Sequence, residues 1–222
     1  MLILGIDDAG RGPLIGPMIL AGVLVTKSQD SQLKKKGVTD SKLLLHEKRV
    51  QLSEIIKTNS ESYFITKATP EEIDSSIKSG INLNTLEAMK AAEIINALNK
   101  KKEQVKVIID CPSVNTNAWR KKLLEFVKHI DNLEVICEHK ADFNYASVSA
   151  ASILAKVERE KEVEKIKKEY GNIGSGYPSD PYTKEFLKTH GKRLENSGIF
   201  RKSWATWKAL FPEKEQSTLG DF

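Results

Sequence analysis

Three apolar runs of this chain end at or near an aspartate, and this arrangement limits the possible folds more than any other feature. The runs and their aspartates are Met1–Ile6 with Asp7 and Asp8, Val105–Ile109 with Asp110, and Leu133–Cys137 with Asp142. Short apolar runs bounded by polar residues are typical of buried strands. Because sites in α/β sheets form beyond the carboxyl ends of the strands, we expect these aspartates to converge at one edge of a sheet.

A group of converging carboxylates needs cations to offset its charge. Such a group suits two-metal hydrolysis, in which two ions about 3.5–4 Å apart hold the attacking and leaving oxygens. The turn Gly10-Arg11-Gly12 follows the first aspartate pair, and its backbone amides and guanidinium can approach a phosphate or a sugar. Plainer interpretations stay open. Asp110 could simply end its strand, and Asp142 could cap the helix that follows it.

The order of the elements predicts an α/β fold with a mixed five-stranded sheet flanked by helices. We expect strands at 1–7, 18–26, 60–67, 105–109 and 133–137, and helices near 45–58, 70–78, 83–98, 119–128, 143–170, 182–190 and 203–210. The first three strands should form an antiparallel meander, and the last two should be added through parallel crossovers. The two short helices at the end should form a small C-terminal helical cap over the cleft.

Composition places few further limits on the function. The formal net charge of +5 is compatible with a polyanionic partner. The chain has no apolar run long enough to span a membrane and no pattern of a secretory signal, so we expect a cytoplasmic protein. Cys111 and Cys137 are the two cysteines, and free thiols are the favoured interpretation, with a disulfide between neighbouring strand ends as the alternative.

Several longer motifs resemble ribonuclease HII of the archaeal type, a type 2 ribonuclease H. They are Gly5–Pro13, Thr39–Lys42, Ile109–Asp110, His139–Asp142, Val148–Lys156 and Gly174–Pro181. Their order and spacing fit over nearly the whole chain. One departure stands at Asp8, where the family usually has a glutamate, whose carboxylate reaches one methylene further.

This resemblance implies a ribonuclease H-like catalytic domain over 1–170, a helical substrate-binding region over 171–212, and a flexible tail over 213–222. It implies an endoribonuclease that cleaves the RNA strand of RNA/DNA hybrids and single ribonucleotides in duplex DNA, during DNA replication and repair. Incision on the 5′ side of the ribonucleotide would leave 3′-hydroxyl and 5′-phosphate ends. Two Mg²⁺ or Mn²⁺ ions would be held by the family's four carboxylates, which correspond here to Asp7, Asp8, Asp110 and Asp142. A monomer is expected.

Two alternatives remain. One is a nuclease of the same fold that acts on branched DNA. The other is a catalytically impaired nucleic-acid-binding module, because Asp8 replaces the usual glutamate.

The resemblance also suggests which residues contact the substrate. Recognition of the 2′-hydroxyl, which distinguishes RNA from DNA, is expected from Gly10, Arg11 and Gly12, with Arg11 also holding a phosphate. Tyr177 should stack beside the junction of ribonucleotide and deoxynucleotide, unless it is a buried turn aromatic.

Ser41 and Lys42 are expected to bind a backbone phosphate, although Ser41 could merely begin the next helix. Lys156 and Arg159 are weaker candidates for duplex contacts, since solvated surface explains them as well. For His139, a structural role is the favoured interpretation.

The last residues of the chain resemble the short motif through which replication and repair proteins bind a sliding clamp (PCNA). Gln216 is followed by Leu219 three residues later and by Phe222 three residues after that. One helical turn places Leu219 and Phe222 on the same side, as a hydrophobic pocket requires. A frayed chain end is the alternative.

Overall fold

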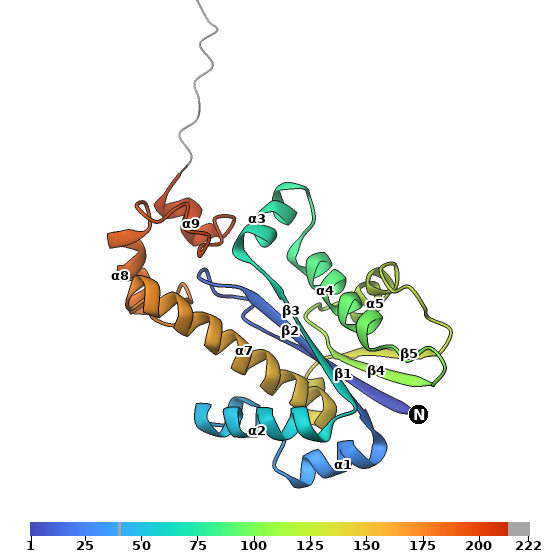
Figure 1. Cartoon of the computed structure of the whole chain (residues 1–222). Coiled ribbons are helices and arrows are strands. Elements are labelled where there is room, and N and C mark those ends of the chain that lie inside the picture. Colours follow the sequence, from blue (N-terminus) through green and yellow to red (C-terminus); the bar gives the residue numbers. More distant parts are fainter. Residues whose placement is uncertain (40, 213–222) are drawn as a thin grey trace, which may run out of the picture.

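A five-stranded mixed sheet forms the centre of the molecule in the computed structural model, which describes residues 1–39 and 41–212 (Figure 1). The strands are β1 (Leu2–Ala9), β2 (Met18–Thr26), β3 (Ser62–Ala68), β4 (Val105–Asp110) and β5 (Leu133–Glu138). They lie in the order β3-β2-β1-β4-β5. The pairs β1–β2 and β2–β3 are antiparallel, whereas β1–β4 and β4–β5 are parallel. The predicted meander with two parallel crossovers is therefore confirmed.

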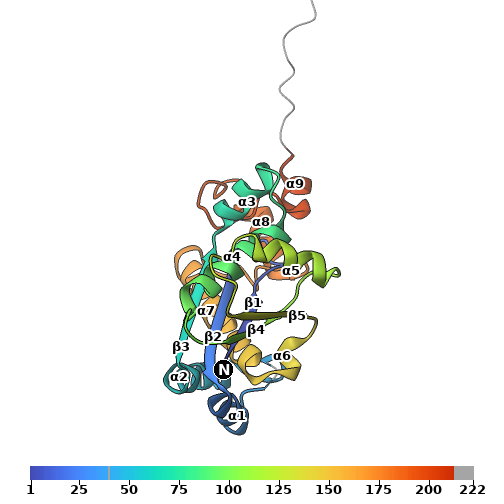
Figure 2. The same cartoon turned by 90° about the vertical axis from the view of Figure 1, so that its right-hand side faces the viewer.

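Helices cover both faces of the sheet (Figures 1 and 2). The helices of the described residues are α1 (Lys27–Lys35), α2 (His46–Asn59), α3 (Pro70–Lys78), α4 (Leu83–Leu98), α5 (Thr116–Leu124), α6 (Ala141–Asn144), α7 (Ala146–Tyr170), α8 (Pro181–His190) and α9 (Ala205–Leu210), with a 3₁₀ turn at Ser41–Leu43. The long helix α7 packs on β1 and β2 beside α1 and α2, and α4 packs on the other face beside α5. Among the described residues, no helix combines the length and apolar character that a membrane span requires.

Strand alternation divides the core between the two faces. On β1, Leu4 and Ile6 belong to the core under α4, so the intervening Gly5 and the following Asp7 face α7. Helix α7 approaches β1 so closely that a Cβ atom on Gly5 would lie 2.2 Å from the backbone carbon of Ser147. This contact requires glycine and brings the N-terminal half of α7 directly against the strand that carries the aspartates.

A third core joins the C-terminal segment to the loop between β1 and β2. Leu14 and Ile15 of that loop pack with Phe186, Phe200 and Trp207, and Ile15 forms an isolated β-bridge with Phe200. The segment with α8 and α9 thus covers the loop that follows Asp7 and Asp8, as the predicted C-terminal cap requires.

One helix was not predicted, and one predicted helix is interrupted. Residues 27–35 form α1, which Thr26 and Gln29 begin with a reciprocal capping box, although few apolar residues mark this helix in the sequence. The predicted helix at 143–170 is broken at Tyr145, whose backbone is extended (φ −125°), so that α6 and α7 are separate. Cys111 and Cys137 are free thiols, as favoured.

Candidate active site

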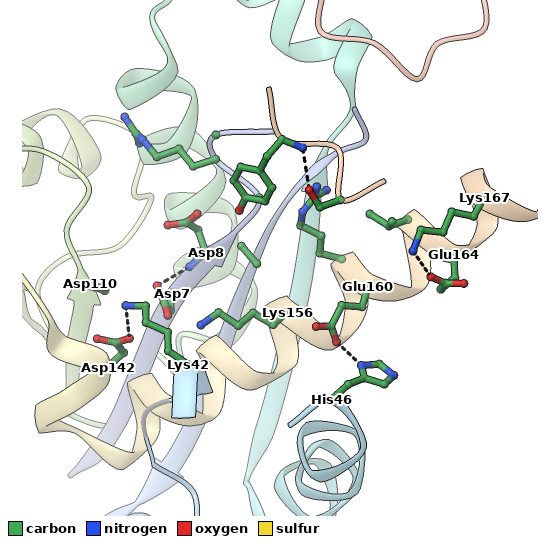
Figure 3. A pocket seen from close by; sticks show the side chains of 18 residues that line it. Asp7, Asp8, Lys42, His46, Asp110, Asp142, Lys156, Glu160, Glu164 and Lys167 are labelled. Atoms are coloured by element: carbon green, nitrogen blue, oxygen red, sulfur yellow. Dashed lines mark hydrogen bonds and ion pairs between the residues drawn. The ribbon is translucent and has the colours of Figure 1, made fainter. Parts of the chain in front are cut away.

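Three aspartates from three different elements meet at the carboxyl ends of β1 and β4 (Figure 3). Asp7 comes from β1, Asp110 ends β4, and Asp142 lies in the first turn of α6. One carboxylate oxygen from each lies within 4.8 Å of the others. The Asp110 carboxylate also accepts a hydrogen bond of 3.2 Å from the amide of Ala141, which fixes the start of α6 beside β4. This group, called the aspartate cluster below, has the spacing and the hard oxygen donors that suit a divalent cation.

Asp8 approaches the site from the other face of the sheet. Successive side chains of a strand point to opposite faces, so Asp7 faces α7 and Asp8 faces the α4 side. Asp8 is accordingly outside the cluster, although all four aspartates line the same cleft. The structure therefore brings three of the four predicted ligands together directly, and metal ligation by Asp8 stays a prediction.

Burial and mutual repulsion raise the pKa values of Asp7, Asp8 and Asp110. Burial is the largest cause of the raised pKa of Asp7, followed by the negative charge of Asp8. Burial raises the pKa of Asp8 to about 6, even though the positive charge of Arg11 acts in the opposite direction. The pKa of Asp110 is raised by burial and by the charge of Asp142. Metal-free, the site therefore holds more negative charge than its surroundings stabilise, and a cation would relieve this repulsion.

Two lysines line the cleft near the aspartates. The Lys42 ammonium lies 3.3 Å from an oxygen of Asp142, and Lys156 donates a hydrogen bond to the Ser41 hydroxyl. That hydroxyl also lies 2.8 Å from the hydroxyl of Ser152 on α7. Ser41 is fully buried, so its predicted direct contact with a phosphate is incompatible with its position. Lys42 remains a candidate for that contact, and Ser41 instead supports Lys156.

The Gly10-Arg11-Gly12 turn forms another wall of the cleft. Gly10 has a φ of +86°, and a Cβ at this position would lie 2.4 Å from Cδ of Arg159. Both its backbone conformation and the close side chain of Arg159 therefore favour glycine here. The ring of Tyr177 lies next to Gly12, 3.4 Å from where a Cβ would stand, and 44% of this tyrosine is exposed. Tyr177 is therefore not a buried turn aromatic, and it is available for stacking.

Two arginines near the turn are occupied by protein groups. The Arg11 guanidinium donates to Asn84 and to the carboxylate of Glu87, both on α4. Arg159 is buried and donates to the carbonyl oxygens of Ile15 and Pro17, so the alternative of a solvated surface position is wrong, and a duplex contact by Arg159 stays a prediction. A phosphate contact by Arg11 stays a prediction.

Sequence reasoning missed three residues beside the turn. Glu87 is a buried carboxylate within an otherwise apolar helix face, and Arg201 and Trp204 reach the turn from the C-terminal segment. Glu87 could have been suspected, because the spacing of its helix predicts a buried position for a charged side chain. No sequence spacing links Arg201 or Trp204 to a turn about 190 residues away.

The cleft that these groups line has a volume of about 930 Å³, and it contains the aspartate cluster, the glycine turn and Tyr177. A carboxylate cluster at the strand ends of a β3-β2-β1-β4-β5 sheet defines a nuclease of the ribonuclease H-like fold. The family model described as Ribonuclease HII matches residues 4–207. The chain belongs to the ribonuclease HII family, whose members are metal-dependent endoribonucleases.

Individual relatives agree with this assignment. Ribonuclease HII of Methanococcus maripaludis is 44% identical over 227 residues, which cover 98% of this chain and 90% of the relative. The crystal structure of ribonuclease H2 from Pyrococcus horikoshii matches with a TM-score of 0.85 and 37% identity, over 95% of this chain and 97% of that one. The RNase HII chain in a solved complex with PCNA from Archaeoglobus fulgidus matches with a TM-score of 0.81 and 36% identity, over 100% of both chains.

Proposed function

We propose that this protein hydrolyses the RNA strand of RNA/DNA hybrids and incises duplex DNA on the 5′ side of single embedded ribonucleotides. The observation that carries the proposal is the aspartate cluster, which lies in one cleft with a glycine turn and an exposed tyrosine. A phosphodiester beside the cluster would place its ribose within reach of that turn. The products would carry 3′-hydroxyl and 5′-phosphate ends, and the role would be ribonucleotide removal during DNA replication and repair.

Asp7, Asp110 and Asp142 are the residues that would hold divalent cations, with Asp8 as a further ligand from the other face of the sheet. Two bound Mg²⁺ or Mn²⁺ ions would supply an activated water and charge neutralisation at the phosphate. Carboxylates fit this role because hard oxygen donors suit both ions, and the raised pKa values of Asp7 and Asp110 fit it because neighbouring negative charges repel one another without a cation.

The remaining cleft residues would position the strand. Lys42, beside Asp142, would attract a phosphate next to the scissile one, and Lys156 adds positive charge to the same cleft near Asp8. Tyr177 would stack on the sugar or base at the ribonucleotide, above Gly12. Backbone groups of the glycine turn would recognise the 2′-hydroxyl, the group that distinguishes RNA from DNA.

The proposal is tested with a DNA duplex that carries one ribonucleotide, together with an RNA/DNA hybrid, all-DNA, all-RNA and branched DNA controls. Each substrate is incubated in Mg²⁺, in Mn²⁺ and in chelator, and the cut ends are mapped. Metal-dependent incision 5′ of the ribonucleotide supports the proposal. Cleavage of branched DNA alone would favour the same-fold alternative, and binding without cleavage in either metal would favour the impaired module.

The Asp110→Asn variant provides the matched control, since it removes one charge of the cluster and keeps the size of the side chain. It should bind the ribonucleotide-containing duplex and lose cleavage by at least about 100-fold. Full turnover by this variant in Mg²⁺ would contradict the assignment of the cluster as the metal site.

A sliding clamp is the proposed protein partner. The relative from Archaeoglobus fulgidus was solved as a PCNA:RNase HII complex, and it aligns with this chain over its full length. The residues predicted to bind the clamp, Gln216, Leu219 and Phe222, lie outside the described residues. The support for this partner is thus the motif in the sequence and the behaviour of the relative.

A further inference from the structure

The carbonyl groups of Gly10 and Arg11 are both bound by one buried guanidinium, that of Arg201. Arg201, in the segment between α8 and α9, is fully buried. Its Nη2 donates to the carbonyl oxygen of Gly10 at 2.6 Å, and its Nη1 donates to that of Arg11 at 2.8 Å. Its Nε donates to the carbonyl oxygen of Gly16 at 3.0 Å. One rigid, planar group therefore fixes two successive peptide units of the turn and the end of the loop.

The direction of these carbonyl groups determines the direction of the amides. No described residue has a cis peptide bond, so the C=O and N–H of each peptide unit point in opposite directions. The carbonyls of Gly10 and Arg11 point at Arg201, so the amides of Arg11 and Gly12 point away from it. All three residues of the turn line the cleft, whereas Arg201 does not. The two amides consequently face the cleft.

These amides are available to a ligand. Within the described part of the chain, neither amide donates a hydrogen bond to a protein acceptor. Two neighbouring N–H groups with parallel orientation form a concave donor pair that suits an oxygen of a phosphate or a hydroxyl. The Arg11 side chain is meanwhile engaged by Glu87 and Asn84, so the backbone is the part of this residue that is directed at the substrate.

We propose that Arg201 is a positioning residue that aims the amides of Arg11 and Gly12 at a backbone oxygen of the ribonucleotide strand. The inference rests on the proposed function, because it assigns the means by which that substrate is held. It also gives the C-terminal segment an indirect part in catalysis, since this segment supplies the group that orients the turn. A guanidinium is needed because a lysine ammonium cannot hold both carbonyls in one plane.

Trp204 supplies a matched control from the same segment. Its indole Nε1 donates to the carbonyl oxygen of Gly12 at 3.1 Å, and its ring stacks on Arg201 at 5.0 Å. The peptide unit after Gly12 ends in Pro13, which has no N–H. Loss of the Trp204 hydrogen bond therefore loosens the same turn without misdirecting an amide, and Trp204→Phe keeps the aromatic stack.

The first test compares the steady-state kinetics of Arg201→Lys and Trp204→Phe on a duplex with one ribonucleotide. Arg201→Lys should lower kcat on the order of 100-fold, with KM within about threefold, because phosphate contacts elsewhere dominate duplex binding. Trp204→Phe should lower kcat by less than about tenfold. Equal losses in both variants, or a loss that only follows the amount of folded protein, would overturn the proposal.

The second test needs no variant and no cleavage. In chelator, the ¹⁵N-labelled native protein is titrated with the ribonucleotide-containing duplex and, separately, with the same duplex in all-DNA form. The amide resonances of Arg11 and Gly12 should shift on binding. Shifts with both duplexes identify a phosphate oxygen as the acceptor, and shifts with the ribonucleotide duplex alone identify the 2′-hydroxyl. Binding without a shift of either resonance would overturn the inference.

The two tests also separate this inference from the proposed function. A native protein whose amide resonances shift but which cuts none of the substrates would refute the proposed reaction and leave the aiming of the amides supported. Cleavage by a protein whose Arg11 and Gly12 amide resonances do not shift on binding would refute the inference about these amides and leave the proposed reaction supported.

Discussion

Arg11 forms an ion pair with Glu87, a carboxylate that is only 2% exposed on α4. The guanidinium is also hydrogen-bonded to Asn84, one turn earlier on the same helix. This pair ties the loop after β1 to the helix that covers the opposite face of the sheet from α7. It links the position of the glycine turn to the stability of the fold.

The ion pair predicts an asymmetric response to mutation. Arg11→Ala leaves the buried Glu87 carboxylate without its cation and should lower the free energy of unfolding by about 3 kcal/mol. Adding Glu87→Gln removes the buried charge and should recover most of that loss. Urea unfolding of the single and double variants measures both steps. A double variant no more stable than Arg11→Ala would show that the pair contributes little.

Lengthening Asp8 should strengthen metal binding. Asp8→Glu adds one methylene, so the carboxylate can extend further toward the aspartate cluster from the α4 side of the sheet. The Mg²⁺ concentration for half-maximal cleavage should fall on the order of tenfold. Asp8→Asn is the control and should raise it. A Mg²⁺ requirement that neither variant changes would exclude Asp8 as a ligand of this site.

Ionisation of Asp8 should lower the free energy of unfolding of the metal-free protein as the pH rises from about 4 through about 6. Burial raises the pKa of Asp8 to about 6, so the folded protein binds more protons than the unfolded chain in this window. The free energy of unfolding then decreases with pH. At pH 7–8 in chelator, Asp8→Asn should be more stable than the native protein by on the order of 1–3 kcal/mol.

The comparison with Asp8→Asn is needed because other carboxylates act in the opposite direction. Lysine, hydroxyl or backbone partners lower the pKa values of Glu54, Glu162, Glu164, Asp180 and Glu195. The advantage of the variant should vanish near pH 4, where both side chains are neutral in the folded protein. An advantage that does not change between pH 4 and pH 8 would contradict the raised pKa.

Removing residues 213–222 should separate clamp binding from catalysis. We expect the truncated protein to cleave short duplexes within about twofold of the native rate, because the described cleft residues all precede position 178. Affinity for the clamp should fall on the order of 100-fold, since aliphatic and aromatic anchors dominate such contacts. Substituting Leu219 and Phe222 with alanine in the full chain should reproduce the loss. Undiminished clamp binding by either protein would refute the assignment.

Local patterns in the sequence were sufficient for most of the elements and for three of the candidate ligands. Strand-like runs end at Asp7 and Asp110, and Asp142 opens a helix after another such run, so parallel crossovers alone bring them to one edge. Thr69 and Asn82 cap α3 and α4, and such caps depend on residues only three positions apart. The meander, the crossovers and the positions of α3 and α4 follow from such short-range rules.

Tertiary packing decided what surrounds the aspartates. The sequence does not reveal that Ser41 would be buried against Ser152, that Arg11 would be paired with Glu87, or that Arg201 would reach the Gly10 carbonyl. These contacts join residues 76 to 191 positions apart, so no local spacing encodes them. By itself the sequence determined that the carboxylates lie at the ends of strands and at the start of a helix, because the patterns that mark strands and helices are local. Only the packing of α4, α7 and the C-terminal segment around the first strand decided which charges are paired and which backbone groups face the cleft.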